Sequence, residues 1–361
     1  MKIHVLILLA VLAVITACSD VVTTAYDERV SGFAVGDTKT TTIGGVTFVM
    51  SYVPDKIIFP MGITEIGTGY LDNSYWICQT EVTNALFAAV LQWAYINGRF
   101  TITNENYNGY VTDIAKYGGK ALIRFTPYPA SNINHSGGNF SSVSGKENLP
   151  VTGVFWYGAI MFCNWITEMR DGNSSNVVYS GMDSTWDNSE TVVDVSKSGY
   201  RLPSNAEWEC AARWVGTSAG GRTDLVSRRT NGGSAGLTPG YYWTPGDYAS
   251  GAMADYNNMT ANQFVAVYDY TDPNPYSEPQ NVMSLGPSSA NALGLYDMSG
   301  NAPEWMFDAD DIYTLRYHRG GWFSVNASYL QVGALSGGSV VTDEHYPGSG
   351  DRLGFRIVRT Q

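Results

Sequence analysis

The side chains that most often carry catalysis or hold metals are scarce in this chain of 361 residues. Beyond the first twenty residues, cysteine and histidine occur only at Cys78, Cys163, Cys210, His135, His318 and His345. None of them has the CxxC or close histidine spacing of a zinc or iron site. No nucleophilic triad motif, P-loop or dinucleotide fingerprint is present either. Cys163 and Cys210 fall in apolar helical stretches, so we expect them to be small buried hydrophobic residues.

The composition argues against a nucleic-acid partner. Lys and Arg number 21 against 33 Asp and Glu, which gives a net charge of −12, and the basic residues form no cluster. Binding to phosphates requires a basic face, so no nucleic acid is expected as a ligand. The 39 glycines, 24 tyrosines and 10 tryptophans indicate an exported protein with many turns and much aromatic packing.

The first residues have the layout of an export signal. Lys2 precedes an apolar run from Val5 to Ile15, which is too short for a permanent membrane span, and small residues then lead to Cys18. Cleavage before Cys18 fits a bacterial lipobox. We therefore expect a signal peptide over 1–17, lipidation of Cys18, and a polar tether over 18–42. An ordinary cleaved signal with an incidental cysteine is the alternative.

The remainder, residues 43–361, contains no linker and no clear internal repeat, so one domain is expected. Hydrophobic periodicity predicts helices over residues 81–95, 154–169 and 204–214. Ser204 and Glu207 have the spacing of a capping box. Elsewhere short β-rich runs alternate with turns, and 291–308 is predicted to be mostly loop. The large aromatics expected in the core are Trp156, Trp208 and Trp305. The fold class is α+β with extensive irregular structure.

Six stretches follow one another in order along this domain. They are TEVTN (80–84), LPVTGVFWYGAIMFCNW (149–165), YRLPSNAEWECAAR (200–213), NALGLYDMSGNAPEW (291–305), RGGWF (319–323) and GFRIVR (354–359). In this order they resemble the formylglycine-generating-enzyme (sulfatase-modifying factor) family, which has a variant of the C-type lectin fold. The resemblance implies that fold for residues 43–361.

The residues that the resemblance would require for catalysis are missing. Catalytic members of the family carry two cysteines after the RGG-type motif and oxidise their substrate through a copper-bound thiolate. Here the last cysteine is Cys210, well before that motif. Ergothioneine-type relatives hold iron through an HxxxHxE pattern, which is also absent. A non-enzyme is therefore expected. The alternative is altered chemistry that uses a carboxylate or a tyrosine in the central cleft.

The stretch between Gly321 and Arg352 has an unusual composition. It contains no Lys or Arg and one Asn, and its apolar residues follow neither a strand nor a helix period. Tyr, Ser and Gly are common in it, as in antibody binding loops. We expect a ligand-binding region over 322–351. Its candidate contact residues are Trp322, Val325, Leu335, Val340, Asp343, His345, Tyr346 and Ser349. A solvated loop is the alternative for each of them taken singly.

This stretch also resembles the mutagenised segment in the variable proteins of diversity-generating retroelements. Those proteins use the same lectin-type scaffold, and replacement of template adenines, often in Asn codons, yields residues of these types but no Lys. Trp322 and Glu344 are not reachable from such Asn codons, so their variability stays open. Phe323 aligns with a tryptophan that is buried in the family and is expected in the core. Its neighbour Trp322 should then face outward, because adjacent side chains of a strand alternate.

One metal site follows from the resemblance alone. A calcium site of the family carries over to Asp297, Gly300, Ala302 and Glu304. A second family calcium site has an aspartate where Met283 stands and is not expected here. The equal alternative is that Asp297 and Glu304 bind amides of their own loop. No other cofactor is expected.

These observations give one leading hypothesis and two alternatives. The leading hypothesis is a non-catalytic receptor or adhesin, anchored through Cys18 in the bacterial envelope and exposed on the outer membrane. Its ligand would be a protein on a host or neighbouring cell. The alternatives are an enzyme of altered chemistry and a structural envelope lipoprotein whose terminal segment is only a solvated loop.

Overall fold

The computed structural model describes residues 32–100, 110–113, 120–124, 132–182, 188–227, 236–309, 315–339 and 352–361. The chain divides after Phe33, and the structure below is that of the unit Ala34–Gln361. The expected signal peptide and Cys18 lie outside the described residues. Within the described part of the chain, no helix has both the length and the apolar character that a bilayer crossing requires.

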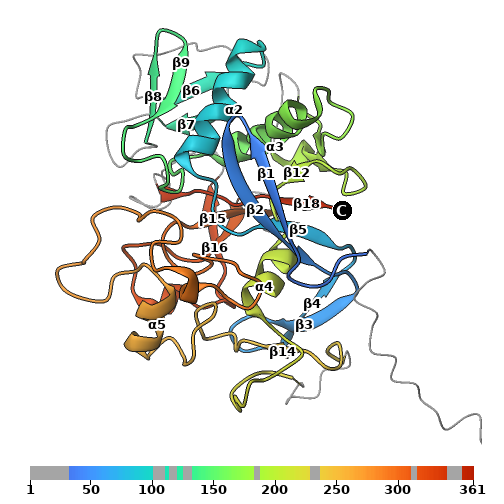
Figure 1. The fold of residues 1–361 in the computed structure, drawn as a ribbon, viewed down its shortest axis with the longest axis vertical. Coiled ribbons are helices and arrows are strands. Elements are labelled where there is room, and N and C mark those ends of the chain that lie inside the picture. Colours follow the sequence, from blue (N-terminus) through green and yellow to red (C-terminus); the bar gives the residue numbers. More distant parts are fainter. Residues whose placement is uncertain are drawn as a thin grey trace, which may run out of the picture. The chain divides into compact units, whose positions relative to one another are not determined.

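A five-stranded antiparallel sheet forms the centre of the unit (Figure 1). In spatial order its strands are β1 (Thr38–Ile43), β2 (Val46–Val53), β5 (Tyr75–Cys78), β18 (Val358–Thr360) and β12 (Tyr200–Arg201). The expected tether over 18–42 is therefore too long, since Thr38 to Thr42 pair with β2 as an edge strand. The last strand of the chain, β18, lies between strands that come much earlier in the sequence.

The two faces of this sheet belong to two hydrophobic clusters, because side chains alternate along a strand. From β5, Trp76 and Cys78 pack with α2 and α3 on one face. Tyr75 and Ile77 pack with α4 on the other face. Figure 1 shows α2 and α3 on one side of the sheet and α4 on the opposite side. The expected core tryptophans Trp156, Trp208 and Trp305 are all buried, as predicted.

The helices of the described residues are α2 (Asn84–Ile96), α3 (Trp156–Asp171), α4 (Asn205–Arg213) and α5 (Met259–Val265). The first three were predicted, and each begins one to three residues later than its hydrophobic pattern. Thr83 is the N-cap of α2, and its side chain accepts a hydrogen bond from Leu86 N at 3.3 Å. Val154 precedes α3 in extended structure: it forms an antiparallel bridge with Ile123, and its amide donates to the carbonyl of Leu353 at 3.1 Å. The capping box of α4 is confirmed.

The remaining strands form a second sheet and several hairpins. The second sheet has the order β15 (Glu304–Ala309), β16 (Leu315–Arg319), β17 (Ser336–Ser339). The hairpins pair β3 (Ile57–Met61) with β4 (Gly67–Leu71), β6 (Tyr110–Asp113) with β7 (Lys120–Arg124), β8 (Ile133–Ser136) with β9 (Asn139–Ser142), β10 (Tyr179–Ser180) with β11 (Val192–Val193), and β13 (Trp214–Gly216) with β14 (Tyr242–Trp243). Since β15 begins at Glu304, the end of the predicted loop 291–308 is a strand.

Candidate ligand-binding site

The segment predicted to bind ligands leaves the second sheet at a double-glycine turn. Gly320 and Gly321 have φ of 94° and 70°, a backbone conformation that glycine adopts without strain. The carbonyl of Gly320 accepts the amide of Gly300 at 2.7 Å, and the amide of Phe323 donates to the carbonyl of Asn301 at 3.1 Å. The start of the segment is therefore fixed against the 291–305 loop.

Arg319 holds the part of the segment that returns to the sheet. Its guanidinium donates to the carbonyls of Val332 and Ala334 at 2.9 and 3.1 Å and pairs with Glu209 at 2.6 Å. Both side chains of this ion pair are buried. Glu209 also accepts from Arg213 at 2.9 Å, so one carboxylate serves two guanidiniums.

The middle of the segment is a short 3₁₀ turn, Ala327–Tyr329, capped by Asn326. Leu330 directly after it is fully buried in a small cluster with Tyr268 and the alanines at 249, 252 and 266. The carbonyl of Leu330 accepts from the Ser299 hydroxyl at 2.7 Å. This part of the segment is therefore seated on the scaffold.

The segment presents some side chains to solvent and buries others. Phe323 is buried as expected, and Trp322 is half-buried beside Tyr329, with ring centroids 6.0 Å apart. Tyr329 and Leu335 are 47% and 42% exposed. Val325 is only 8% exposed, so its side chain is not available as the contact that we expected. The candidates Val340, Asp343, His345, Tyr346 and Ser349 lie outside the described residues.

A groove of about 440 Å³ adjoins the segment. It is lined by Tyr256, Asn257, Met259, Tyr268, Asp269, Tyr270, Thr271, Asp272, Asn326 and Ala327, and we call it the tyrosine–aspartate groove. The segment contributes one edge of the groove, and the amide of Asp269 bonds the carbonyl of Val325 at 2.9 Å. No local sequence pattern indicates this site, because its walls come from residues 256–272 and from Asn326 and Ala327, which are distant in the chain.

The residues expected to hold calcium do not fit a cation. Both carboxylate oxygens of Glu304 accept from Arg356 at 2.7 Å, and one also accepts from the Trp208 indole at 2.7 Å. A guanidinium therefore already occupies the place of a cation. Asp297 accepts from the amide of Met283 at 2.8 Å. Gly300 and Ala302 are buried beside them. In the described ranges, no cluster of His, Cys, Asp and Glu is arranged to hold a metal. The alternative that these two carboxylates bind protein groups agrees better with this geometry.

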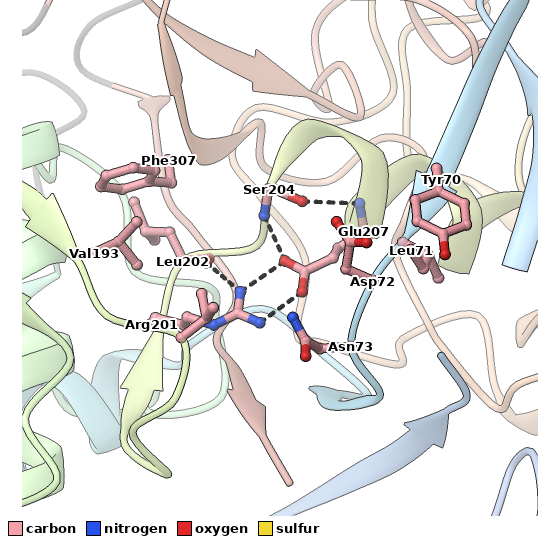
Figure 2. Close-up of a pocket in the computed structure, with 11 residues that line it drawn as sticks. Tyr70, Leu71, Asp72, Asn73, Val193, Arg201, Leu202, Ser204, Glu207 and Phe307 are labelled. Carbon is pink, nitrogen blue, oxygen red and sulfur yellow. Dashed lines mark hydrogen bonds and ion pairs between the residues drawn. The ribbon is translucent and has the colours of Figure 1, made fainter. Parts of the chain in front are cut away.

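A second hollow, of about 220 Å³, lies where α4 begins (Figure 2). Its main charged groups bind each other: both terminal nitrogens of Arg201 lie 2.6 Å from the Glu207 carboxylate. Glu207 also accepts from the Ser204 amide at 2.8 Å. Burial acts to raise the pKa of Glu207, but Arg201 and these hydrogen bonds outweigh it and hold the pKa below its usual value. The hollow therefore covers a structural ion pair that closes the start of α4.

The cysteines of the described residues and His318 are buried. Cys78, Cys163 and Cys210 are free thiols without solvent access, and burial raises the pKa of each. Burial also lowers the pKa of His318 to about 4, which keeps it neutral at physiological pH. The thiolate is the reactive form of cysteine, so these thiols are poorly suited to catalysis.

The fold and the sequence together define the family. Residues 51–361 match the model of the sulfatase-modifying factor enzyme 1-like domain, and the chain belongs to this family. The α+β fold is the formylglycine-generating-enzyme variant of the C-type lectin fold, as predicted.

Two curated relatives show how far the sequence likeness extends. The chain is 29% identical over 243 residues to the "Chaperone protein LppX" of Paenibacillus barcinonensis, with 62% of this chain and 74% of that protein covered. It is 26% identical over 295 residues to the formylglycine-generating enzyme of Streptomyces coelicolor, with 76% and 64% covered. The chain thus spans less than two thirds of that enzyme.

Two solved structures share the fold. "Treponema denticola variable protein 1" superposes with a TM-score of 0.54 at 23% identity and covers 90% of this chain and 99% of its own. CarF superposes with a TM-score of 0.52 at 22% identity, covering 86% and 97%. At these identities the likeness establishes the architecture alone.

Proposed function

We propose that this protein is a non-catalytic envelope receptor that binds a ligand through residues 322–351 and is tethered by a lipid on Cys18. The ligand would be a protein on a host or neighbouring cell, and the segment would be diversified by a retroelement. The protein would be displayed on the outer membrane.

The observation that carries this proposal is the way in which the segment is held. The scaffold forms hydrogen bonds with the main chain of the segment. Ser299 and Arg319 donate to the carbonyls of residues 330, 332 and 334. The amides of Val332 and Gly333 donate to the carbonyls of residues 248 and 246. Contacts to main-chain atoms do not depend on side-chain identity. Outward residues such as Tyr329 and Leu335 can therefore change without loss of these bonds.

The absence of catalysis is supported by the chemistry of the thiols. The catalytic members of the family depend on two cysteines after the RGG-type motif, and residues 322–361 contain none. The cysteines that remain are buried, and burial raises their pKa, which disfavours a thiolate.

The decisive test compares the 3′ end of the gene in many descendants of one cell. We expect a reverse-transcriptase gene nearby and an imperfect repeat of the 3′ end that differs at adenines. Substitutions should fall within 322–351, reach Tyr329 and Leu335, and spare the buried Phe323 and Leu330. An even spread of substitutions over the gene, or none in this region, would refute the diversification.

Two further assays address the other parts of the proposal. Labelling with a radioactive fatty acid should mark the wild type and not Cys18→Ala, and equal labelling would refute the anchor. Incubation with a sulfatase-type cysteine peptide should yield no aldehyde. Aldehyde formation would support the enzyme alternative instead.

A further inference from the structure

The tyrosine–aspartate groove carries negative charge without a counter-ion. Within the described residues, neither the Asp269 nor the Asp272 carboxylate makes a hydrogen bond or an ion pair, and none of the residues lining the groove is Lys, Arg or His. Basic groups near the segment have their own partners: Arg222 binds Asp224 at 2.5 Å, and Arg352 donates to the Ser324 hydroxyl. An incoming cation would meet no local positive charge in the described lining.

The rest of the lining suits the stem and the planar head of a long cationic side chain. Tyr256 and Tyr270 in the lining are half-buried, whereas Tyr268, whose ring lies 5.5 Å from that of Tyr270, is buried. Tyrosine faces attract cations, and a guanidinium both stacks on such rings and binds carboxylates through paired donors. Met259, 51% exposed, and Ala327 offer apolar surface for the methylene groups of the stem. A volume of about 440 Å³ lies within the range of pockets that hold small ligands.

We propose that this groove binds an arginine side chain of the partner protein, with Asp269 and Asp272 facing the guanidinium and Tyr270 packing against it. The inference rests on the proposed function, because it makes the groove a fixed anchor beside the variable contacts. Most of the groove lies outside residues 322–351. A partner could therefore be oriented by this arginine while the changeable segment sets the specificity.

The test uses the full-length protein labelled with ¹³C at the methionine methyl groups. Acetyl-Gly-Arg-Gly-amide is titrated in, and the same peptide with citrulline in place of arginine serves as a neutral probe of equal shape. The Met259 methyl signal reports on the groove, and the exposed Met253 and Met283 signals report on non-specific effects. We expect a saturable shift of Met259 with the arginine peptide, at least about tenfold weaker binding of the citrulline peptide, and weaker binding in high salt.

Variants assign the effect to the two carboxylates. Asp269→Asn and Asp272→Asn should each weaken binding of the arginine peptide about three- to fivefold, and the double variant about tenfold or more. Asp72→Asn is the matched control, because it removes an equal charge at an exposed site outside the groove and should change nothing. Equal binding of the two peptides, an unmoved Met259 signal, or full binding by the double variant would overturn the proposal.

The two proposals fail separately. Diversity confined to 322–351 together with equal binding of arginine and citrulline peptides would remove the arginine anchor and leave the receptor. Arginine binding that depends on Asp269 and Asp272, in a gene with no diversity over 322–351, would refute the diversified receptor and leave a cation site.

Discussion

Asp297→Asn is expected to stabilise this protein at neutral pH and to destabilise it slightly at pH 4. Asp297 is 3% exposed, and its carboxylate accepts the Met283 amide at 2.8 Å, which an asparagine carbonyl can also accept. Its φ of 55° is a conformation that asparagine tolerates well. The substitution therefore removes a buried charge and keeps the loop geometry.

The magnitude follows from the pKa of Asp297. Burial raises that pKa from 3.8 to about 6, and Glu304 adds to the rise. Between these values the unfolded chain releases its proton while the folded protein keeps it. The contribution of Asp297 to the free energy of unfolding therefore falls as pH rises through this window and is constant above it. The ionised Asp297 therefore destabilises the folded protein by about 3 kcal/mol, since each tenfold change in proton affinity corresponds to about 1.4 kcal/mol. After about 1 kcal/mol for burying an amide, we expect a net gain of about 2 kcal/mol at pH 8.

The assay is thermal unfolding of both proteins from pH 4 to pH 8, in buffers of equal ionic strength. For about 330 residues the unfolding entropy is about 0.7 kcal/mol/K, so 2 kcal/mol corresponds to about 3 °C. The Tm of the variant should lie about 1 °C below that of the wild type at pH 4 and about 3 °C above it at pH 8. The difference between the two proteins is the diagnostic quantity, because burial also raises the pKa of Glu81. A difference that does not vary with pH would refute the reasoning.

Further predictions concern calcium and the support of the C-terminal segment. Excess EGTA or added calcium should leave the Tm unchanged, because Arg356 neutralises Glu304; a calcium-dependent rise would mean that the cation displaces it. Glu209→Gln should lower the free energy of unfolding by about 3–5 kcal/mol, because it removes the negative charge that neutralises two buried guanidiniums, those of Arg213 and Arg319. Denaturant unfolding measures this loss, and a loss under about 1 kcal/mol would contradict the prediction. Phe323→Ala should lower the free energy of unfolding by about 3–5 kcal/mol, because Phe323 is buried. Trp322→Ala should lower it by under about 1.5 kcal/mol, because Trp322 is only half-buried. The reverse order would mean that the orientations of the two side chains are exchanged.

The sequence predicted those features that depend on neighbouring residues. The capping box of α4 lies within four residues, and its hydrogen bonds are those expected from Ser204 and Glu207. Phe323 is more deeply buried than its half-buried neighbour Trp322, which is the order expected from the sequence, although neither residue lies in a strand. Helix α5 was missed because its seven residues are too few to show a period.

What the sequence could not predict depends on partners distant in the chain. Val325 is buried, and its carbonyl receives the amide of Asp269, 56 residues earlier in the chain. Glu304 was a candidate calcium ligand, but its counter-ion is Arg356, 52 residues later. No local pattern indicates either pairing. The same holds for the tyrosine–aspartate groove, which exists only when Asn326 and Ala327 meet the chain around α5.

Main-chain support also determines where the segment cannot change. A Cβ at Gly333 would lie 2.5 Å from the backbone of Gly62 and Ile63, and one at Gly321 would lie 2.7 Å from the carbonyl of Tyr329. Any side chain at these positions would clash with the neighbouring backbone that holds the segment in place. Between them, Tyr329 is nearly half exposed, so new side chains there meet solvent and not the scaffold. A segment with fixed glycines and open positions between them can alter its surface chemistry at little cost in stability, which is the physical requirement for a recognition site that is rewritten by mutation.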